Sequence, residues 1–237
     1  MTALSLEVHG LCAGYASARV IEDVSFRADT GHTLAVLGRN GAGKTTLLAS
    51  IIGLTKRHAG TITMGGEDIS PLPAPERARR GLGYVPQTRD VFGSLTVEEN
   101  LYVGLKGRGS GALSEAYALF PRLKERRRLL GSQLSGGEQQ MLSVARTLLG
   151  QPRVLLLDEP LEGLAPAVCD ELMVSLHTLA ANGGMTIILA EQQIERALDF
   201  ARRVHILDRG QLVWSGTSSE LRRNRETIDQ YLGVGVH

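Results

Sequence analysis

The chain has 237 residues, of which 43% are hydrophobic and 22% charged, and its formal net charge is +1. This length suits one large domain, or a domain with an inserted lobe. The near-neutral charge gives no electrostatic case for an anionic membrane surface or for nucleic acid, which we do not expect as a partner. Cys12 and Cys169 lack metal-ligand spacing and favour a reducing, cytosolic compartment. We expect neither a membrane-spanning segment nor a secretory signal.

Short apolar segments predict strands near both ends of the chain. Residues 4–8 and 20–28 alternate between apolar and polar, as half-buried paired strands do. Residues 33–37 form an apolar run that ends at Gly38, which is typical of a buried parallel strand, and residues 43–52 predict a helix. Further strands are predicted at 61–64, 82–85, 154–157, 186–189, 204–207 and 211–214.

The pattern between these groups of strands is helical. From Thr96 to Gly150 apolar side chains recur at helical spacing, with one face formed by Val97, Leu101 and Leu105. A second apolar face is formed by Leu113, Tyr117 and Phe120. Strands, then helices, then alternating strands and helices predict one α/β core that carries a helical lobe.

A phosphate-binding loop follows the first buried strand. Residues 38–45, GRNGAGKT, match G-x-x-x-x-G-K-[ST] between a predicted strand and a predicted helix. The glycines let backbone N–H groups approach phosphate oxygens, Lys44 supplies a positive charge to the β and γ phosphates, and the Thr45 hydroxyl can ligate Mg²⁺. A glycine-rich turn without a ligand fits this context poorly. Nucleotide contacts are expected from Gly38, Arg39, Asn40, Gly41, Ala42, Gly43, Lys44, Thr45 and Thr46.

Two acids end a second apolar strand. Residues 154–157 lead into Asp158 and Glu159, and parallel sheets bind ligands at the carboxyl ends of their strands. Asp158 suits the hydration shell of Mg²⁺, and Glu159 suits a residue that orients or deprotonates the attacking water. Alone this pattern is weak. Together with the phosphate loop it predicts ATP and Mg²⁺ as ligands and ATP hydrolysis as the reaction.

A third motif opens the helix predicted to run to about Leu149. In the segment LSGGEQQ, Ser135 and Glu138 have the spacing of a capping box. The two glycines between them leave bare backbone amides at a helix N-terminus, where an anion can bind. From spacing alone, a well-capped helix without a ligand remains an equally good interpretation.

The segment LSGGEQQ resembles the signature motif of ATP-binding-cassette (ABC) ATPases, and the motifs match that family in order over the full chain. The resemblance implies a single nucleotide-binding domain, residues 1–237. Its implied fold is α/β: a P-loop NTPase (RecA-like) core, an antiparallel β subdomain and an inserted α-helical subdomain at about 88–150. Gln87 resembles the Q-loop glutamine, which would be a metal contact with Thr45 and Asp158. Tyr15 matches the aromatic residue that stacks on adenine.

The resemblance also implies a dimeric mechanism. Two such subunits face head to tail, and each ATP lies between the phosphate loop of one and the signature helix of the other. The residues that would serve the partner's ATP are Ser135, Gly136, Gly137, Glu138 and Gln139. Hydrolysis would move transmembrane permease subunits through residues 88–105, and an external binding protein indirectly. The subunit would sit peripherally on the cytoplasmic face of the plasma (inner) membrane.

Two positions depart from the general family pattern. Gln192 stands where most members have a switch histidine, and Ala165 stands where the D-loop usually has an aspartate. A carboxamide can donate a hydrogen bond to the γ phosphate but does not titrate near neutral pH. We take Glu159 and Gln192 as the catalytic candidates, and we expect His205 to be a packed strand residue. Together with these departures, the segments EP-x-x-GLAP (residues 159–166, whose last four residues we call the GLAP segment) and AEQ (residues 190–192) resemble LivF-like importer ATPases for branched-chain amino acids, whose relatives handle urea or short amides.

Alternative functions stay open at this point. A soluble cassette ATPase that acts on ribosomes or DNA is disfavoured, because the chain has no second phosphate loop and no sustained heptads. A lipid- or lipopolysaccharide-exporting ATPase is disfavoured by Gln192 and the GLAP segment, through resemblance only. A catalytically inactive scaffold fits poorly with Lys44, Asp158 and Glu159 all present. We expect a heterodimer with a second ATPase, and the motifs do not fix the transported solute.

Overall fold

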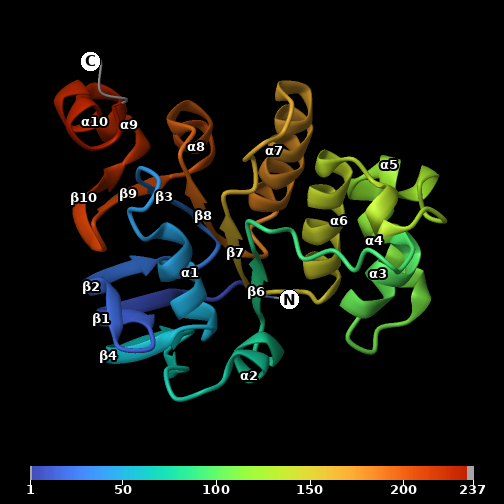
Figure 1. The fold of residues 1–237 in the computed structure, drawn as a ribbon, viewed down its shortest axis with the longest axis horizontal. Helices are drawn as coiled ribbons and strands as arrows, with labels where there is room; N and C mark the ends of the chain where they lie inside the picture. Colours follow the sequence, from blue (N-terminus) through green and yellow to red (C-terminus); the bar gives the residue numbers. More distant parts are fainter. Residues whose placement is uncertain (1, 234–237) are drawn as a thin grey trace.

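The computed structural model describes residues 2–233 and contains two sheets and a helical region (Figure 1). The strands are β1 Leu6–Tyr15, β2 Ala18–Ala28, β3 Thr33–Leu37, β4 Lys56–Met64, β5 Glu67–Asp68, β6 Leu82–Val85, β7 Val154–Asp158, β8 Thr186–Glu191, β9 Arg203–Asp208 and β10 Gln211–Thr217. The α-helices are α1 Lys44–Ile52, α2 Ala74–Arg79, α3 Val97–Gly104, α4 Leu113–Leu119, α5 Pro121–Glu125, α6 Gly136–Leu149, α7 Pro166–Ala181, α8 Ile194–Phe200, α9 Ser218–Arg223 and α10 Arg225–Tyr231.

The strands form a six-stranded sheet of order β10-β9-β3-β8-β7-β6 and a four-stranded sheet of order β2-β1-β4-β5. In the larger sheet every neighbouring pair is parallel except β10 with β9, whereas the smaller sheet is antiparallel throughout. Helices α3 to α6 occupy the chain between β6 and β7 and lie together at one side of the molecule (Figure 1). The predicted fold class, an α/β core with an antiparallel sheet and an inserted helical region, is confirmed.

The apolar strands of the larger sheet are buried on both faces. Along β3, Leu34 and Val36 pack in the core shared with the antiparallel sheet, while Ala35 and Leu37 face the core on the other side. Helix α1 lies within the first of these cores, and eight of its nine residues are buried. Because adjacent strand residues point to opposite faces, continuous apolar runs are needed where both faces are covered.

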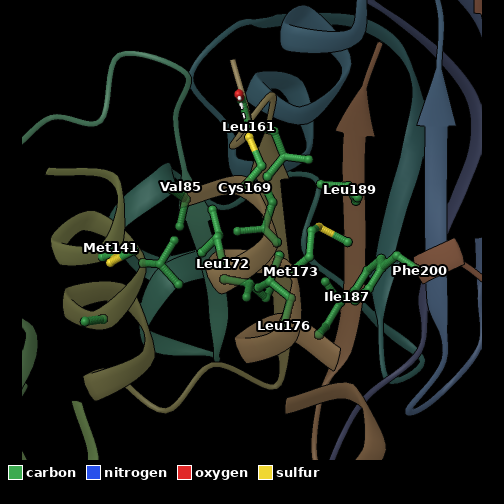
Figure 2. Close-up of a cluster of buried hydrophobic side chains, with 14 of the residues drawn as sticks. Val85, Met141, Leu161, Cys169, Leu172, Met173, Leu176, Ile187, Leu189 and Phe200 are labelled. Carbon is green, nitrogen blue, oxygen red and sulfur yellow. Dashed lines mark hydrogen bonds between the residues drawn. The ribbon is translucent and has the colours of Figure 1, made fainter. Parts of the chain in front are cut away.

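Helix α7 covers the opposite face of the larger sheet. Its residues Cys169, Leu172 and Leu176 pack against strand residues that include Ile187 and Leu189 (Figure 2). All of these side chains are buried. The helix thereby fixes the segment that connects it to the end of β7, where the two predicted acids lie.

Strand β1 is longer than the sequence predicts. Alternation indicated a strand at residues 4–8, but β1 continues to Tyr15, with register shifts against both neighbours after Val8. Gly10 has a φ of +56° at this irregularity. A β-bulge adds a residue to one strand and so breaks the period-two pattern by which a strand is recognised. The short elements β5 and α2 also lack a clear sequence signal.

One buried cation ties the short helix α2 to the end of α1. The Arg77 guanidinium donates to the carbonyls of Ser50 and Ile51 at 3.0 and 2.7 Å, and to those of Leu72 and Ser70, each at 2.9 Å. Arg77 is 3% exposed, and burial lowers its pKa. The last carbonyls of a helix have no partner within the helix, so this side chain stabilises the C-terminus of the helix that begins at Lys44.

We therefore predict that Arg77→Ala lowers the free energy of unfolding by roughly 3 kcal/mol, because several buried carbonyl groups lose their hydrogen-bond donor. Urea unfolding followed by circular dichroism measures the change. Arg79→Ala is the matched control, since Arg79 lies on the same helix and is exposed. Equal midpoints for the two variants would contradict this role for Arg77.

Candidate functional site

The phosphate loop turns sharply between β3 and α1. Gly41 and Gly43 have φ values of +80° and +107°, which glycine adopts without strain. A side chain on Gly38 would place its Cβ 2.5 Å from the Leu207 carbonyl oxygen, so only glycine fits there. Helix α1 starts at Lys44 and points its N-terminal N–H groups toward the loop. Such a helix terminus attracts anions.

Lys44 is held inside this loop. Its Nζ donates to the carbonyls of Gly38 at 2.8 Å and Arg39 at 3.1 Å, and it lies 2.9 Å from Oε1 of Glu159. The side chains of Lys44 and Glu159 are only 2% and 6% exposed. In a buried ion pair each charge offsets part of the cost of removing the other from water, and loss of either partner leaves an uncompensated charge. The loop and the acidic strand end are thus joined through one contact.

Asp158 ends β7 next to α1. The Thr45 hydroxyl donates to its Oδ1 at 3.2 Å, and the Tyr84 hydroxyl donates to its Oδ2 at 3.1 Å. Burial raises the pKa of Asp158 to about 6, although both hydrogen bonds act in the opposite direction. Burial and the neighbouring Asp158 also raise the pKa of Tyr84. Sequence reasoning missed Tyr84; its one signal is a hydroxyl near the carboxyl end of β6, the strand that pairs with β7.

Glu159 adopts a left-handed backbone conformation with a φ of +45°. Its N–H donates to the Ala190 carbonyl at 2.9 Å, and its Oε2 accepts a hydrogen bond of 2.6 Å from Nε2 of Gln192. Non-glycine residues are rarely held in this conformation, and such residues cluster at functional sites. Each carboxylate oxygen of Glu159 therefore has one partner: Lys44 on one side and Gln192 on the other.

A cavity of about 290 Å³ lies over the loop. Among the described residues its lining comprises Val20, Asn40, Gly41, Gly43, Lys44, Thr45, Thr46, Gln87 and Glu159. The structure thus gathers much of the predicted nucleotide set around one opening. Tyr15 is not in this lining but is 51% exposed at the end of β1, where its ring is free to stack. The Arg39 guanidinium donates to the Gly233 carbonyl at 2.5 Å.

The structure brings together two of the three residues predicted to contact a metal. Thr45 and Asp158 are in contact, whereas Nε2 of Gln87 donates to the carboxylate of Glu162. Arg89 also reaches this segment, with Nη2 3.4 Å from the Glu162 carbonyl oxygen. Glu162 and Arg89 were not predicted as site residues. Residues 2–233 contain no group of three or more His, Cys, Asp or Glu side chains placed to hold a metal. Hydroxyl and carboxylate oxygens nonetheless fit Mg²⁺, which uses few protein ligands beside phosphates and water.

The signature segment lies at the start of α6, as predicted. Ser135 is the N-cap: its Oγ accepts the Glu138 N–H at 3.3 Å, and the Glu138 carboxylate accepts the Ser135 N–H at 2.9 Å. A Cβ on Gly137 would lie 2.6 Å from Val168, so α7 restricts that position to glycine. Ser135 to Gln139 are absent from the described lining of the phosphate-loop cavity. Phosphate loop and signature segment therefore occupy separate places on one chain.

The elements above define a class of protein. A glycine-rich loop with a buried lysine joins the parallel strand β3 to a helix. Strand β7, separated from β3 by β8, leads into two acids at the same edge of the sheet. This is the arrangement of P-loop nucleotide-hydrolysing domains. The family model described as ABC transporter matches residues 21–162. The chain belongs to this family, as a subunit that binds and hydrolyses ATP.

The most similar relatives include transport ATPases of two kinds. A high-affinity branched-chain amino acid transport ATP-binding protein, BraG of Pseudomonas aeruginosa, is 38% identical over 92% of this chain and 95% of its own. A probable branched-chain amino acid transport ATP-binding protein, LivF of Archaeoglobus fulgidus, is 35% identical over 94% and 97%. The lipopolysaccharide export system ATP-binding protein LptB of Escherichia coli is 34% identical over 97% of both chains.

Solved structures agree with the fold. The structure of an ATP-binding subunit of an ABC transporter superposes with a TM-score of 0.81, 30% identity and 93% coverage of both chains. A nucleotide-free ATP-binding cassette superposes with a TM-score of 0.82 at 21% identity, with 96% of both chains covered. The second match supports the fold alone, whereas the first also lies within the family.

We predict that Glu159→Gln nearly abolishes ATP turnover while ATP binding is kept or strengthened. The amide cannot accept the proton of an attacking water, and it no longer repels the γ phosphate beside Lys44. We expect the variant to form an ATP-locked dimer, which size-exclusion chromatography with ATP detects. Phosphate release measures turnover.

Lys44→Ala is the contrasting variant. It removes the positive charge that the phosphates meet, so fluorescent ATP titration should show weakened binding. Ordinary turnover in Glu159→Gln, or the same loss of ATP binding in both variants, would contradict the separate roles of the two residues.

Proposed function

We propose that this subunit drives an importer of branched-chain amino acids or related small solutes such as urea or short amides. The observation that carries the proposal is Gln192 in the switch position, within hydrogen-bond distance of Glu159. The GLAP segment and the two relatives named for branched-chain amino acid transport support it. The 34% identity to LptB keeps a lipopolysaccharide-type exporter as the second candidate.

In the proposed chemistry each residue of the site has one role. Lys44 and the loop amides would bind the phosphates, Tyr15 would stack on the adenine, and Thr45, Asp158 and Gln87 would hold Mg²⁺. The metal neutralises charge on the phosphates when it is bound. Glu159 accepts the proton of the attacking water. Gln192 orients that carboxylate through Nε2 and can donate to the γ phosphate once the carboxylate moves.

The proposed assembly is a head-to-tail pair of ATPases. Ser135 to Gln139 lie outside the phosphate-loop cavity, at the start of α6. The Ser135 hydroxyl is engaged with Glu138 in the capping box, so the groups we assign to a nucleotide held by a second subunit are first of all the N–H groups of Gly136 and Gly137. LivF-like importers commonly combine two different ATPases, and we propose a heterodimer in the cell. Ala165 supplies no carboxylate to this interface, so any signal between the subunits must use other groups.

The proposed surface for the permease is the exposed apolar part of the helical region. Phe92, Tyr102, Val103 and Leu130 expose between 38% and 55% of their surface. The buried Asn100 holds the backbone of this surface, donating to the carbonyls of Phe92, Leu95 and Thr96 and accepting the Phe92 N–H. No helix among residues 2–233 is long and apolar enough to cross a bilayer. Docking through such a surface would keep the subunit peripheral on the cytoplasmic face of the membrane.

We predict that Val103→Asp prevents copurification with transmembrane permease subunits while the ATPase activity of the isolated chain is kept, because a charge in an apolar interface loses its hydration. Val174→Asp is the matched control: Val174 is 65% exposed on α7, and Val103 is 55% exposed on α3. Equal recovery of permeases with both variants would place the docking surface elsewhere.

The transported solute is tested with the assembled complex. In vesicles that contain this subunit, its copurified partners and their binding protein, leucine, isoleucine or valine should raise ATP hydrolysis and accumulate inside. Stimulation by urea or acetamide alone would narrow the cargo to the related solutes. Copurification with lipopolysaccharide-extracting partners, and no response to any of these solutes, would overturn the proposal in favour of the exporter.

A further inference from the structure

A buried carboxylate outside the predicted site joins the two segments that carry the catalytic candidates. Glu191 ends β8 and is 2% exposed. Its Oε1 accepts the N–H of Leu161 at 3.1 Å. Its Oε2 accepts the N–H groups of Gln192 at 2.9 Å and Gln193 at 3.3 Å. One side chain therefore supplies partners to backbone groups of the segment after Glu159 and of the segment that contains Gln192.

The position of Glu191 follows from how the strand pairing ends. β7 and β8 pair in parallel as far as Asp158 and Ala190, and the Glu159 N–H still donates to the Ala190 carbonyl. At Glu159 the chain turns away with a φ of +45°. Buried backbone N–H groups must be paired, and beyond this turn the strand no longer provides the acceptor. Glu191 provides it for Leu161 instead.

Among residues 2–233 the hydrogen-bond partners of the Glu191 carboxyl are these three backbone N–H groups. Burial raises the pKa of this carboxyl, and the three backbone hydrogen bonds act against that rise. An ionised carboxylate offers acceptor sites on both oxygens, and charge-assisted hydrogen bonds are stronger than neutral ones. The Leu161 side chain is fully buried in the core beside α7, so packing holds in place the residue whose N–H binds Glu191 (Figure 2).

We propose that Glu191 is a positioning residue for ATP hydrolysis, which acts by holding Gln192 against Glu159. Gln192 is one end of the 2.6 Å contact with Glu159, and Leu161 lies two residues after the other end. Both are fixed by the same carboxylate. We call the three hydrogen bonds of Glu191 to Leu161, Gln192 and Gln193 the clamp. Without them the two segments can move independently, and a small displacement of a catalytic group costs a large part of the rate. The proposal rests on the proposed roles of Glu159 and Gln192.

The test is a double-mutant cycle between Glu191→Gln and Gln192→Ala, measured as steady-state ATP hydrolysis. The amide at position 191 keeps one acceptor oxygen and turns a donor toward the other backbone N–H groups. We expect kcat to fall about tenfold or more, with the KM for ATP changed less than about twofold, because the phosphate loop is untouched. In the Gln192→Ala background the same change should lower kcat less than about threefold.

Controls separate positioning from loss of structure. Glu195→Gln removes a carboxylate from the exposed start of α8, close to Glu191 in sequence, and should leave kcat unchanged. Fluorescent ATP titration and thermal unfolding are recorded for each variant. If Glu191→Gln does not fold, the cycle is run with Glu191→Asp, which keeps the charge but is one methylene too short to reach both segments.

Three outcomes would overturn the clamp: an unchanged kcat, effects of Glu191→Gln and Gln192→Ala that multiply, or a parallel loss of ATP binding and thermal stability. Failure of the underlying assignment is recognised separately. Normal turnover in Glu159→Gln removes the catalytic role itself. An inactive Glu159→Gln together with multiplying effects at positions 191 and 192 removes only the clamp.

Discussion

Lys44 and Glu159 meet in the interior of the molecule at 2.9 Å, and the remaining site contacts are arranged around this pair. Removing two charges from water costs several kcal/mol per ion, so neither side chain is stable there without the other. The pair ties the loop after β3 to the end of β7. In the proposed function the lysine is a shared partner, because a bound γ phosphate would compete with Glu159 for the same ammonium group. Phosphate binding would thereby favour release of the carboxylate through charge.

The parallel sheet sets which residues can take part in this competition. In register, Leu37 of β3 lies beside Glu191 of β8, and Ala190 lies beside Asp158 of β7. The phosphate loop, the two acids and Gln192 are therefore delivered to one edge by three neighbouring strands. Both faces of these strands are covered, so a slip by one residue would exchange their two sets of apolar side chains and force each into the packing of the opposite core.

Much of the fold and of the candidate site could be predicted from the sequence because their motifs are local. The phosphate loop, the acids after 154–157 and the capping box at Ser135 each occupy a few consecutive residues. Tyr84, Glu162 and Glu191 have no such signal. Their partners Asp158, Gln87 and Leu161 lie 74, 75 and 30 positions away, so only the folded chain brings them together. The second half of β1 was not predicted because a strand is recognised by unbroken alternation, which the bulge at Gly10 interrupts.

The glutamine at position 192 changes what the surrounding protein must supply. A histidine in that place could gain a proton and be drawn electrostatically to phosphate or carboxylate, whereas a carboxamide stays neutral and acts only through the direction of its N–H bonds. Its amide group is oriented by the Glu159 carboxylate, which can only accept. Its backbone is oriented by Glu191. A neutral donor that depends on geometry thus lies beside a buried carboxylate that fixes its backbone, so we infer that the two residues function as a unit.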